Sequence, residues 1–154
     1  MLALLPRLRR FARSLARDAA DADDLCQITI EKALLARSSW QAGTRLDSWM
    51  YRIMRNAWID TTRSRARAAE TFVDAEAGAG IGEAGGAEAR VALNEVEAAM
   101  RTLPDEQREA VALVLVEGLA YREAAEVLDI PMGTLTSRLV RWRQALMTLL
   151  GEAA

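Results

Sequence analysis

The chain has 154 residues, 51% of them apolar and 27% charged, a composition typical of one globular domain or of two small ones. It contains no histidine and one cysteine, which excludes nearly all zinc sites, catalytic triads that use histidine, and a disulfide within the chain. The net charge of −2 combines three unlike segments: residues 1–69 carry +6, residues 70–99 carry −6 and residues 100–154 carry −2.

Apolar residues recur at spacings of three and four along the N-terminal part, which predicts amphipathic helices. Two stripes come first: Leu5, Leu8, Phe11 and Leu15, then Leu25, Ile28 and Leu35. Asp21 is the expected N-cap of the second helix. It belongs to a cluster of four aspartates between residues 18 and 24, of which capping and the helix dipole explain one or two. The others suit a surface that binds a partner.

No secretory or membrane-spanning segment is predicted. The longest apolar run, residues 110–116, is far shorter than the roughly 18 residues that a span needs. The apolar start is followed by Arg7, whereas a signal peptide carries its positive charges before the apolar stretch. We therefore expect a cytoplasmic protein in which Cys26 is an inert, buried thiol.

The next stretch combines aromatic residues with arginines. Four aromatic residues fall within nineteen positions: Trp40, Trp49, Tyr51 and Trp58. Aromatic faces stack unpaired bases and arginines follow a phosphate backbone, which favours a surface for single-stranded nucleic acid. Trp49 and Trp58 also fit the inward face of a helix, so a purely structural role stays open at this point.

Residues 66–92 lack an apolar stripe and are rich in glycine and acidic residues, which predicts a flexible linker between two helical domains, 1–65 and 93–154. Gly80, Gly82 and Gly85 spell G-x-G-x-x-G, but no strand precedes them and no helix follows at once. That context excludes a dinucleotide site, and the sequence predicts neither a cofactor nor a metal site.

The second domain contains a predicted helix-turn-helix. A short helix over 121–128 directs Ala124, Ala125 and Leu128 inward, and Pro131 then interrupts the hydrogen-bond ladder. A further helix begins near Gly133 or Thr134. Its inward stripe consists of Leu135, Leu139, Trp142 and Leu146. Its outer face and edges carry hydroxyls and arginines suited to base edges and phosphates: Thr134, Thr136, Ser137, Arg138, Arg141 and Arg143.

Four of these segments, in this order, resemble the extracytoplasmic-function (ECF) sigma factors of bacterial RNA polymerase. Residues 21–27 resemble the family's D-A-x-D-L-x-Q, and residues 46–60 its W-L-x-x-I-x-R-N-x-x-I-D. Residues 103–108 and 121–143 resemble its region 4, including P-x-G-T-x-x-S-R-L-x-R-x-R. Residues 41–46 are similar to the alphaproteobacterial stress-response branch. Thr136 departs from the family's frequent basic residue, and Trp142 from its usual alanine.

The resemblance implies an all-α protein that is not an enzyme and that has three kinds of partner: RNA polymerase core, promoter DNA and an anti-sigma factor. Contacts with the coiled coil of the largest polymerase subunit are implied for Asp21, Asp24, Leu25 and Gln27, and region 4 is expected at the flap. Contacts with the −10 element are implied for Gln41, Thr44, Arg45, Arg52, Arg55, Asn56, Arg63 and Arg65. Contacts with the −35 element are implied for Tyr121, Arg122, Thr134, Thr136, Ser137, Arg138, Arg141 and Arg143.

Two other functions are compatible with the pattern. A stand-alone helix-turn-helix regulator would bind duplex DNA without polymerase, which the acidic second domain and the long linker disfavour. A sigma mimic would titrate an anti-sigma factor without touching DNA, which the arginines on both predicted DNA faces disfavour. An enzyme is disfavoured because no pair of carboxylates and no nucleophile–base pair stands out.

Overall fold

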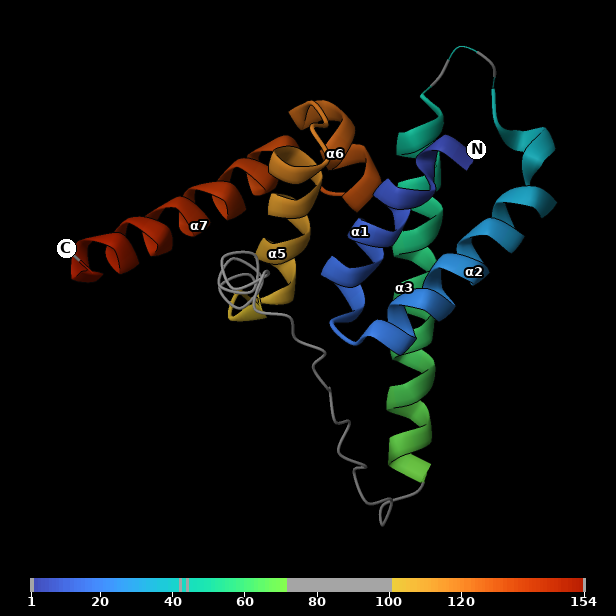
Figure 1. Cartoon of the computed structure of the whole chain (residues 1–154), viewed down its shortest axis with the longest axis horizontal. Coiled ribbons are helices and arrows are strands. Elements are labelled where there is room, and N and C mark those ends of the chain that lie inside the picture. Colours follow the sequence, from blue (N-terminus) through green and yellow to red (C-terminus); the bar gives the residue numbers. More distant parts are fainter. Residues whose placement is uncertain (1, 42, 44, 72–100, 154) are drawn as a thin grey trace.

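The computed structural model describes residues 2–41, 43, 45–71 and 101–153, and within these ranges the chain is all-α, as predicted (Figure 1). Thr44 and residues 72–92 of the predicted linker lie outside the described residues. In the part of the chain that is described, no helix combines the length and the apolar character needed to cross a membrane.

The N-terminal unit consists of three α-helices with two short 3-10 turns. A turn, η1 (Leu2–Leu4), leads into α1 (Leu5–Ala16), followed by α2 (Ala19–Leu35), η2 (Arg37–Ser39) and α3 (Leu46–Thr71). Helix α1 packs against both α2 and α3. Because α3 continues to Thr71, residues 66–71 of the predicted linker are helical.

The start of α2 differs from the prediction. Arg17 adopts a positive φ of 67° after α1, and the chain reverses there. Asp18, with an extended backbone, is then the N-cap, so the predicted N-cap Asp21 lies inside the helix. The interruption that places this start is a backbone conformation of an arginine, which the apolar pattern does not mark.

The core of the N-terminal unit lies where its three helices meet. Phe11 and Tyr51 are fully buried, with ring centroids 5.2 Å apart in an edge-to-face arrangement. Cys26 is 5% exposed, as predicted, and burial raises the pKa of its thiol. Trp49 and Trp58 are half-buried and pack against this core, so each combines a packing role with partial exposure.

The C-terminal unit contains the helix-turn-helix. It comprises α5 (Asp105–Val111), the π-helix η4 (Ala112–Val116), α6 (Tyr121–Leu128) and α7 (Met132–Ala153). The bounds of α6 confirm the prediction, and α7 begins one residue before the predicted start. In the turn, Asp129 adopts a left-handed φ of 56°, and the Ile130 N–H donates to the Ala125 carbonyl at 3.1 Å. This bond closes α6 in the manner of a Schellman motif.

The two units pack against each other. Helix α1 contacts α5, α3 contacts α6, and the buried residues of both units form one apolar cluster. Helix α7 packs on α5 and α6, and its C-terminal end points away from the three N-terminal helices (Figure 1). The two predicted domains are therefore in direct contact in this structure.

Candidate nucleic-acid interface

The predicted polymerase contacts lie in the first half of α2. Asp24 and Gln27 are exposed and, three residues apart, share one face of the helix. Leu25 is only 2% exposed and packs in the core, so it is not accessible to a partner and anchors α2 instead. Of the four predicted residues, Asp24 and Gln27 are therefore the ones placed to touch a partner directly.

Asp21, predicted to bind polymerase, is paired with Arg65, predicted to bind DNA. Both guanidinium Nη atoms donate to the carboxylate at 2.8 Å. The hydrogen bonds from Arg65 lower the pKa of Asp21, and the guanidinium also lies 5.8 Å from the centroid of the Trp58 ring. The two predicted surfaces thus meet at one ion pair on the α2–α3 side of the molecule.

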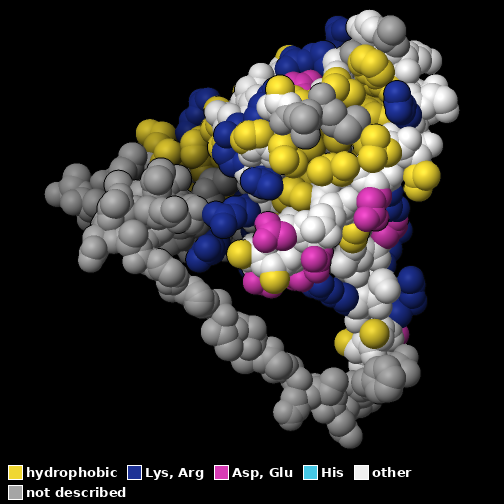
Figure 2. All heavy atoms as spheres, turned by 45° about the vertical axis from the view of Figure 1, so that its right-hand side comes forward, with side chains coloured by type: hydrophobic (Ala, Val, Ile, Leu, Met, Phe, Trp, Pro, Cys, Tyr) yellow, Lys and Arg dark blue, Asp and Glu magenta, His cyan; other side chains and the backbone are white. Residues whose placement is uncertain are grey.

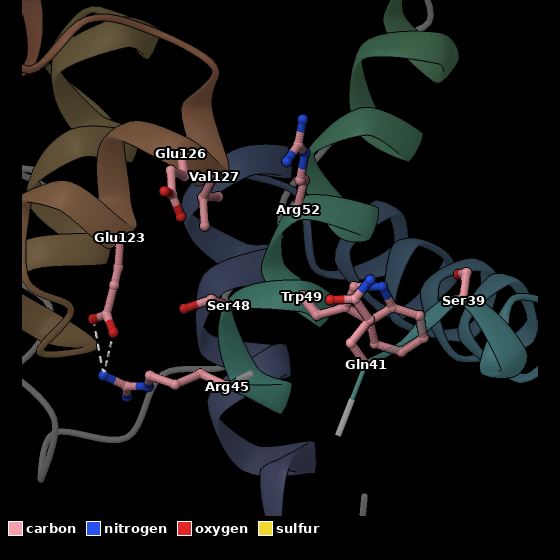
Figure 3. A pocket seen from close by; sticks show the side chains of 9 residues that line it. All are labelled: Ser39, Gln41, Arg45, Ser48, Trp49, Arg52, Glu123, Glu126 and Val127. Carbon is pink, nitrogen blue, oxygen red and sulfur yellow. Dashed lines mark hydrogen bonds and ion pairs between the residues drawn. The ribbon is translucent and has the colours of Figure 1, made fainter. Parts of the chain in front are cut away.

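A cleft of about 330 Å³ separates the start of α3 from α6 (Figure 3). Three of the predicted −10 residues line it: Gln41, Arg45 and Arg52. The Trp49 ring lies beside Gln41 in this cleft, with its centroid 6.5 Å from that of Trp40. Trp49 thus lines one cleft with two arginines, and these residue types bind unpaired bases and phosphates.

Two of the predicted −10 arginines form ion pairs with carboxylates of the C-terminal unit. Arg45 Nη1 donates to both carboxylate oxygens of Glu123, at 2.8 and 3.0 Å (Figure 3). Arg55 forms a bidentate pair with Glu109, at 3.0 and 3.1 Å, and also donates to the Leu128 carbonyl at 3.0 Å. Three further residues of the −10 set are exposed on α3 outside the ion pairs described above: Arg52, Asn56 and Arg63.

The predicted −35 residues lie on α6 and α7. Six of them are exposed: Tyr121, Arg122, Thr136, Ser137, Arg141 and Arg143. Thr134 is half-buried. Thr136 is exposed, but its hydroxyl donates to the Met132 carbonyl at 3.0 Å.

Arg138 is less accessible than its neighbours in the predicted −35 set. Its side chain is 16% exposed, with Nη2 3.8 Å from a carboxylate oxygen of Glu106. Its Nη1 is buried without a hydrogen-bond partner. An unsatisfied guanidinium N–H is costly, so we expect Arg138 to change rotamer readily when an acceptor approaches.

The surface is not uniformly basic. In the view of Figure 2, basic and acidic side chains lie side by side over the lower part of the compact body. A second cleft, of about 420 Å³, is lined by Arg52 of the −10 set and Arg122 of the −35 set, together with Asp129. The structure therefore brings residues of the two predicted DNA surfaces together.

A buried polar centre, not predicted from the sequence, lies between the two units. Glu117 has a side chain only 1% exposed. Arg10 donates to its two oxygens at 2.9 Å each, Arg7 donates at 3.4 Å, and the Tyr51 hydroxyl donates at 2.8 Å. Burial, followed by the hydrogen bond to Glu117, raises the pKa of Tyr51. No local pattern marks these residues, because their partners are 66 to 110 positions away.

Three aspartates with lowered pKa values make the free energy of unfolding depend on pH in the acidic range. Hydrogen bonds from Arg108 and Arg17 lower the pKa of Asp105, and those from Arg65 lower the pKa of Asp21. Burial opposes ionisation of Asp47, but hydrogen bonds from Arg45, the Ser48 N–H and Arg7 outweigh it, so its pKa is also lowered.

Because the folded pKa of each group lies below the ordinary value of 3.8, the unfolded chain takes up protons first as the pH falls. We expect an unfolding free energy that is nearly constant between about pH 7 and pH 5 and then falls steadily toward pH 3. Urea titrations across this range measure it. The Asp21→Asn variant should show a smaller acid-dependent loss, and a flat profile down to pH 3 would contradict the expectation.

Comparison with known proteins agrees with the geometry. The family models of sigma-70 region 2 and sigma-70 region 4 match residues 1–68 and 93–146. The ECF RNA polymerase sigma factor EcfG of Rhodopseudomonas palustris is 38% identical over 150 residues, covering 97% of this chain and 82% of that protein.

Two solved structures are also similar. One is the sigma factor RpoE of Bartonella quintana, solved in complex with the anti-sigma factor NepR. It is 33% identical to this chain with a TM-score of 0.81, and the match covers 97% of this chain and 93% of RpoE. The anti-anti-sigma factor PhyR of the same organism, also solved with NepR, has a TM-score of 0.54 at 19% identity, and this chain covers 43% of it, which is a likeness of fold alone. The chain matches the region 2 and region 4 models in order and is 38% identical to EcfG along nearly its whole length. It therefore belongs to the ECF RNA polymerase sigma factors.

Proposed function

We propose that this chain directs RNA polymerase core to specific promoters as a non-enzymatic, cytoplasmic specificity subunit. The observation that supports this most strongly is the helix-turn-helix, which presents Arg122, Ser137, Arg141 and Arg143 on an exposed face. That face suits base edges and phosphates of a −35 element in a duplex major groove.

The N-terminal unit is the proposed site of −10 recognition and melting. Trp49, Arg45 and Arg52 all line the cleft at the start of α3, and side chains of these types can stack a base and neutralise a phosphate. Asp24 and Gln27, exposed on one face of α2, are the proposed contacts with the polymerase coiled coil. Residues 1–65 thus form the core-binding and −10 domain, residues 93–154 the flap and −35 domain, and residues 66–92 the connection.

An anti-sigma factor is the proposed regulatory partner, in a stress response. The similarity to RpoE, whose solved structure contains NepR, supports a partner of that kind. A sigma mimic is disfavoured, because a protein that never touched DNA would have no need of the exposed arginines on α7.

In vitro transcription with purified core polymerase and a pool of promoter fragments tests the proposal. We expect discrete transcripts that require the protein. The Asp24→Ala, Gln27→Ala double variant should lose them together with core binding in a pull-down. The matched control is Asp23→Ala, which removes the same charge from an exposed position about 100° around α2.

Two results would contradict the proposal. Tight duplex binding by the protein alone, without transcripts, would indicate a stand-alone regulator. Absence of both transcripts and DNA binding would indicate a mimic. Full activity of the double variant would instead show that the core-binding face on α2 has been misplaced.

A further inference from the structure

A buried carboxylate, Asp47, lies in the first turn of α3 and does not belong to the predicted −10 residues. Its side chain is 7% exposed, and it accepts four hydrogen bonds. Arg45 donates two of them, from Nε at 3.1 Å and from Nη2 at 2.6 Å. The Ser48 N–H donates at 2.7 Å and Arg7 Nη2, from α1, donates at 3.0 Å. A buried charge requires partners of this kind, and all of these donors belong to the N-terminal unit.

The two bonds from Arg45 hold its guanidinium along one edge. Nε and Nη2 meet separate oxygens of Asp47, which is the side-on fork geometry of an arginine–carboxylate pair. The Arg45 side chain is 48% exposed, so the carboxylate is the inner partner and the guanidinium the outer one. Nη1 is the nitrogen left to donate outward, and in this structure it reaches an oxyanion on α6, the Glu123 carboxylate (Figure 3).

Asp47 is itself held firmly within the N-terminal unit. The Arg7 guanidinium that donates to it lies 5.7 Å from the ring centroid of Tyr51, which is fully buried. Burial opposes ionisation of Asp47, but the hydrogen bonds lower its pKa, so the carboxylate is charged at neutral pH. The contacts that fix Asp47 and Arg45 to each other are therefore independent of where the C-terminal unit lies.

We propose that Asp47 is a positioning residue for −10 recognition: it holds Arg45 so that Nη1 is directed at a phosphate of the unpaired promoter strand. The inference rests on the proposed −10 role of Arg45. A free arginine side chain loses much rotational freedom when it binds DNA, whereas one that is already held loses little more. Asp47 thereby strengthens DNA binding without touching the DNA.

The sign of the effect separates this role from simple electrostatics. Asp47 is negative, so its removal from a surface near DNA reduces repulsion of the phosphates and on that ground alone strengthens binding. If Asp47 positions Arg45, its removal weakens binding instead. A third role, support of the fold alone, would lower binding to core polymerase together with promoter opening.

The experiment uses the full chain assembled with core polymerase. The probe is the promoter fragment that gives the strongest protein-dependent transcript in the pool, and permanganate reactivity of its unpaired thymines reports −10 opening. We expect Asp47→Asn to need about 2- to 12-fold more holoenzyme for half-maximal opening, the range for immobilising one flexible side chain. The control is Glu70→Gln, which removes a negative charge from an exposed position of the same helix and should leave opening unchanged.

Two further variants identify Arg45 as the residue through which Asp47 acts. In an Arg45→Ala background, Asp47→Asn should cause no additional loss. Arg45→Lys keeps the positive charge and the buried carboxylate, but a lysine cannot form the side-on fork, so we expect a loss of about the same 2- to 12-fold. This variant tests the inference without altering the buried residue. Far-UV circular dichroism and a pull-down with core polymerase should give the same result for Arg45→Lys as for the unmodified protein.

Several results would overturn the inference and leave the proposed function intact, provided that the unmodified protein opens the fragment. One is opening by Asp47→Asn that equals or exceeds that of Glu70→Gln, and another is full opening by Arg45→Lys. A further loss from Asp47→Asn in the Arg45→Ala background would show that Asp47 acts independently of Arg45. Absence of opening by the unmodified protein on every fragment would overturn the proposed function and the inference together.

Discussion

Phe11→Ala is expected to lower the free energy of unfolding by about 3–5 kcal/mol, because truncation of a fully buried phenylalanine leaves a cavity that the neighbours fill only in part. Phe11 has no exposed surface and packs edge-to-face on Tyr51, which is also fully buried. The same substitution removes the ring that holds Tyr51 in place to donate to Glu117. We therefore expect loss of rigidity at the interface between the two units as well as in the N-terminal core.

Urea denaturation followed by circular dichroism measures this loss. A single transition is expected, because the buried residues of the two units belong to one cluster. Leu35→Ala is the control: this side chain is 87% exposed at the end of α2, and its truncation should change stability by less than about 0.5 kcal/mol. A loss of under about 1 kcal/mol for Phe11→Ala would show that the α1–α3 packing is not the centre of the core.

Arg141→Ala is expected to reduce promoter-specific transcription about 5- to 150-fold, the range that corresponds to one good base contact of about 1–3 kcal/mol. Arg141 lies on the exposed face of α7 and makes no ion pair with a described residue, so its loss should cost nothing in folding. Binding to core polymerase should remain unchanged, because the proposed core contacts lie on α2.

Arg101→Ala is the control that separates the effect of position from the effect of losing one positive charge. This arginine is exposed in the same unit but precedes α5, outside the helix-turn-helix. Transcription titrated with each variant, and with promoters altered base by base in the −35 element, gives the readout. Equal losses for both variants, or a loss for Arg141→Ala that is the same on every sequence, would indicate a general electrostatic effect rather than base recognition.

Elements with a strong local pattern were predictable from the sequence. The stripe that includes Leu8 and Phe11 gave α1, and the small residues Ala124 and Ala125 followed by Pro131 gave α6 and its turn with the observed bounds. These features are readable because helical periodicity and the missing N–H of proline act within a few residues. The start of α2 was missed because a positive φ at Arg17 has no sequence marker.

The candidate site shows the same division between local and distant effects. The arginines of α3 and α7 were identifiable as DNA-binding candidates by residue type and face. Their ion-pair partners were not identifiable from the sequence. Arg55 pairs with Glu109 and Arg45 with Glu123, which are 54 and 78 positions away. The chemistry of a side chain determines which groups it is able to bind, whereas the tertiary packing determines which group it contacts.

The sequence by itself determined the helical class, the helix-turn-helix and the resemblance to ECF sigma factors, because each depends on residue type and on spacing along one helix or one turn. Only the tertiary structure decided that the acidic second unit closes over the arginines of the first and that Glu117 is buried between them. The physical reason is that ion pairing and desolvation depend on distance in space. Packing of the two units brings together opposite charges that lie far apart in the sequence and that no local pattern connects.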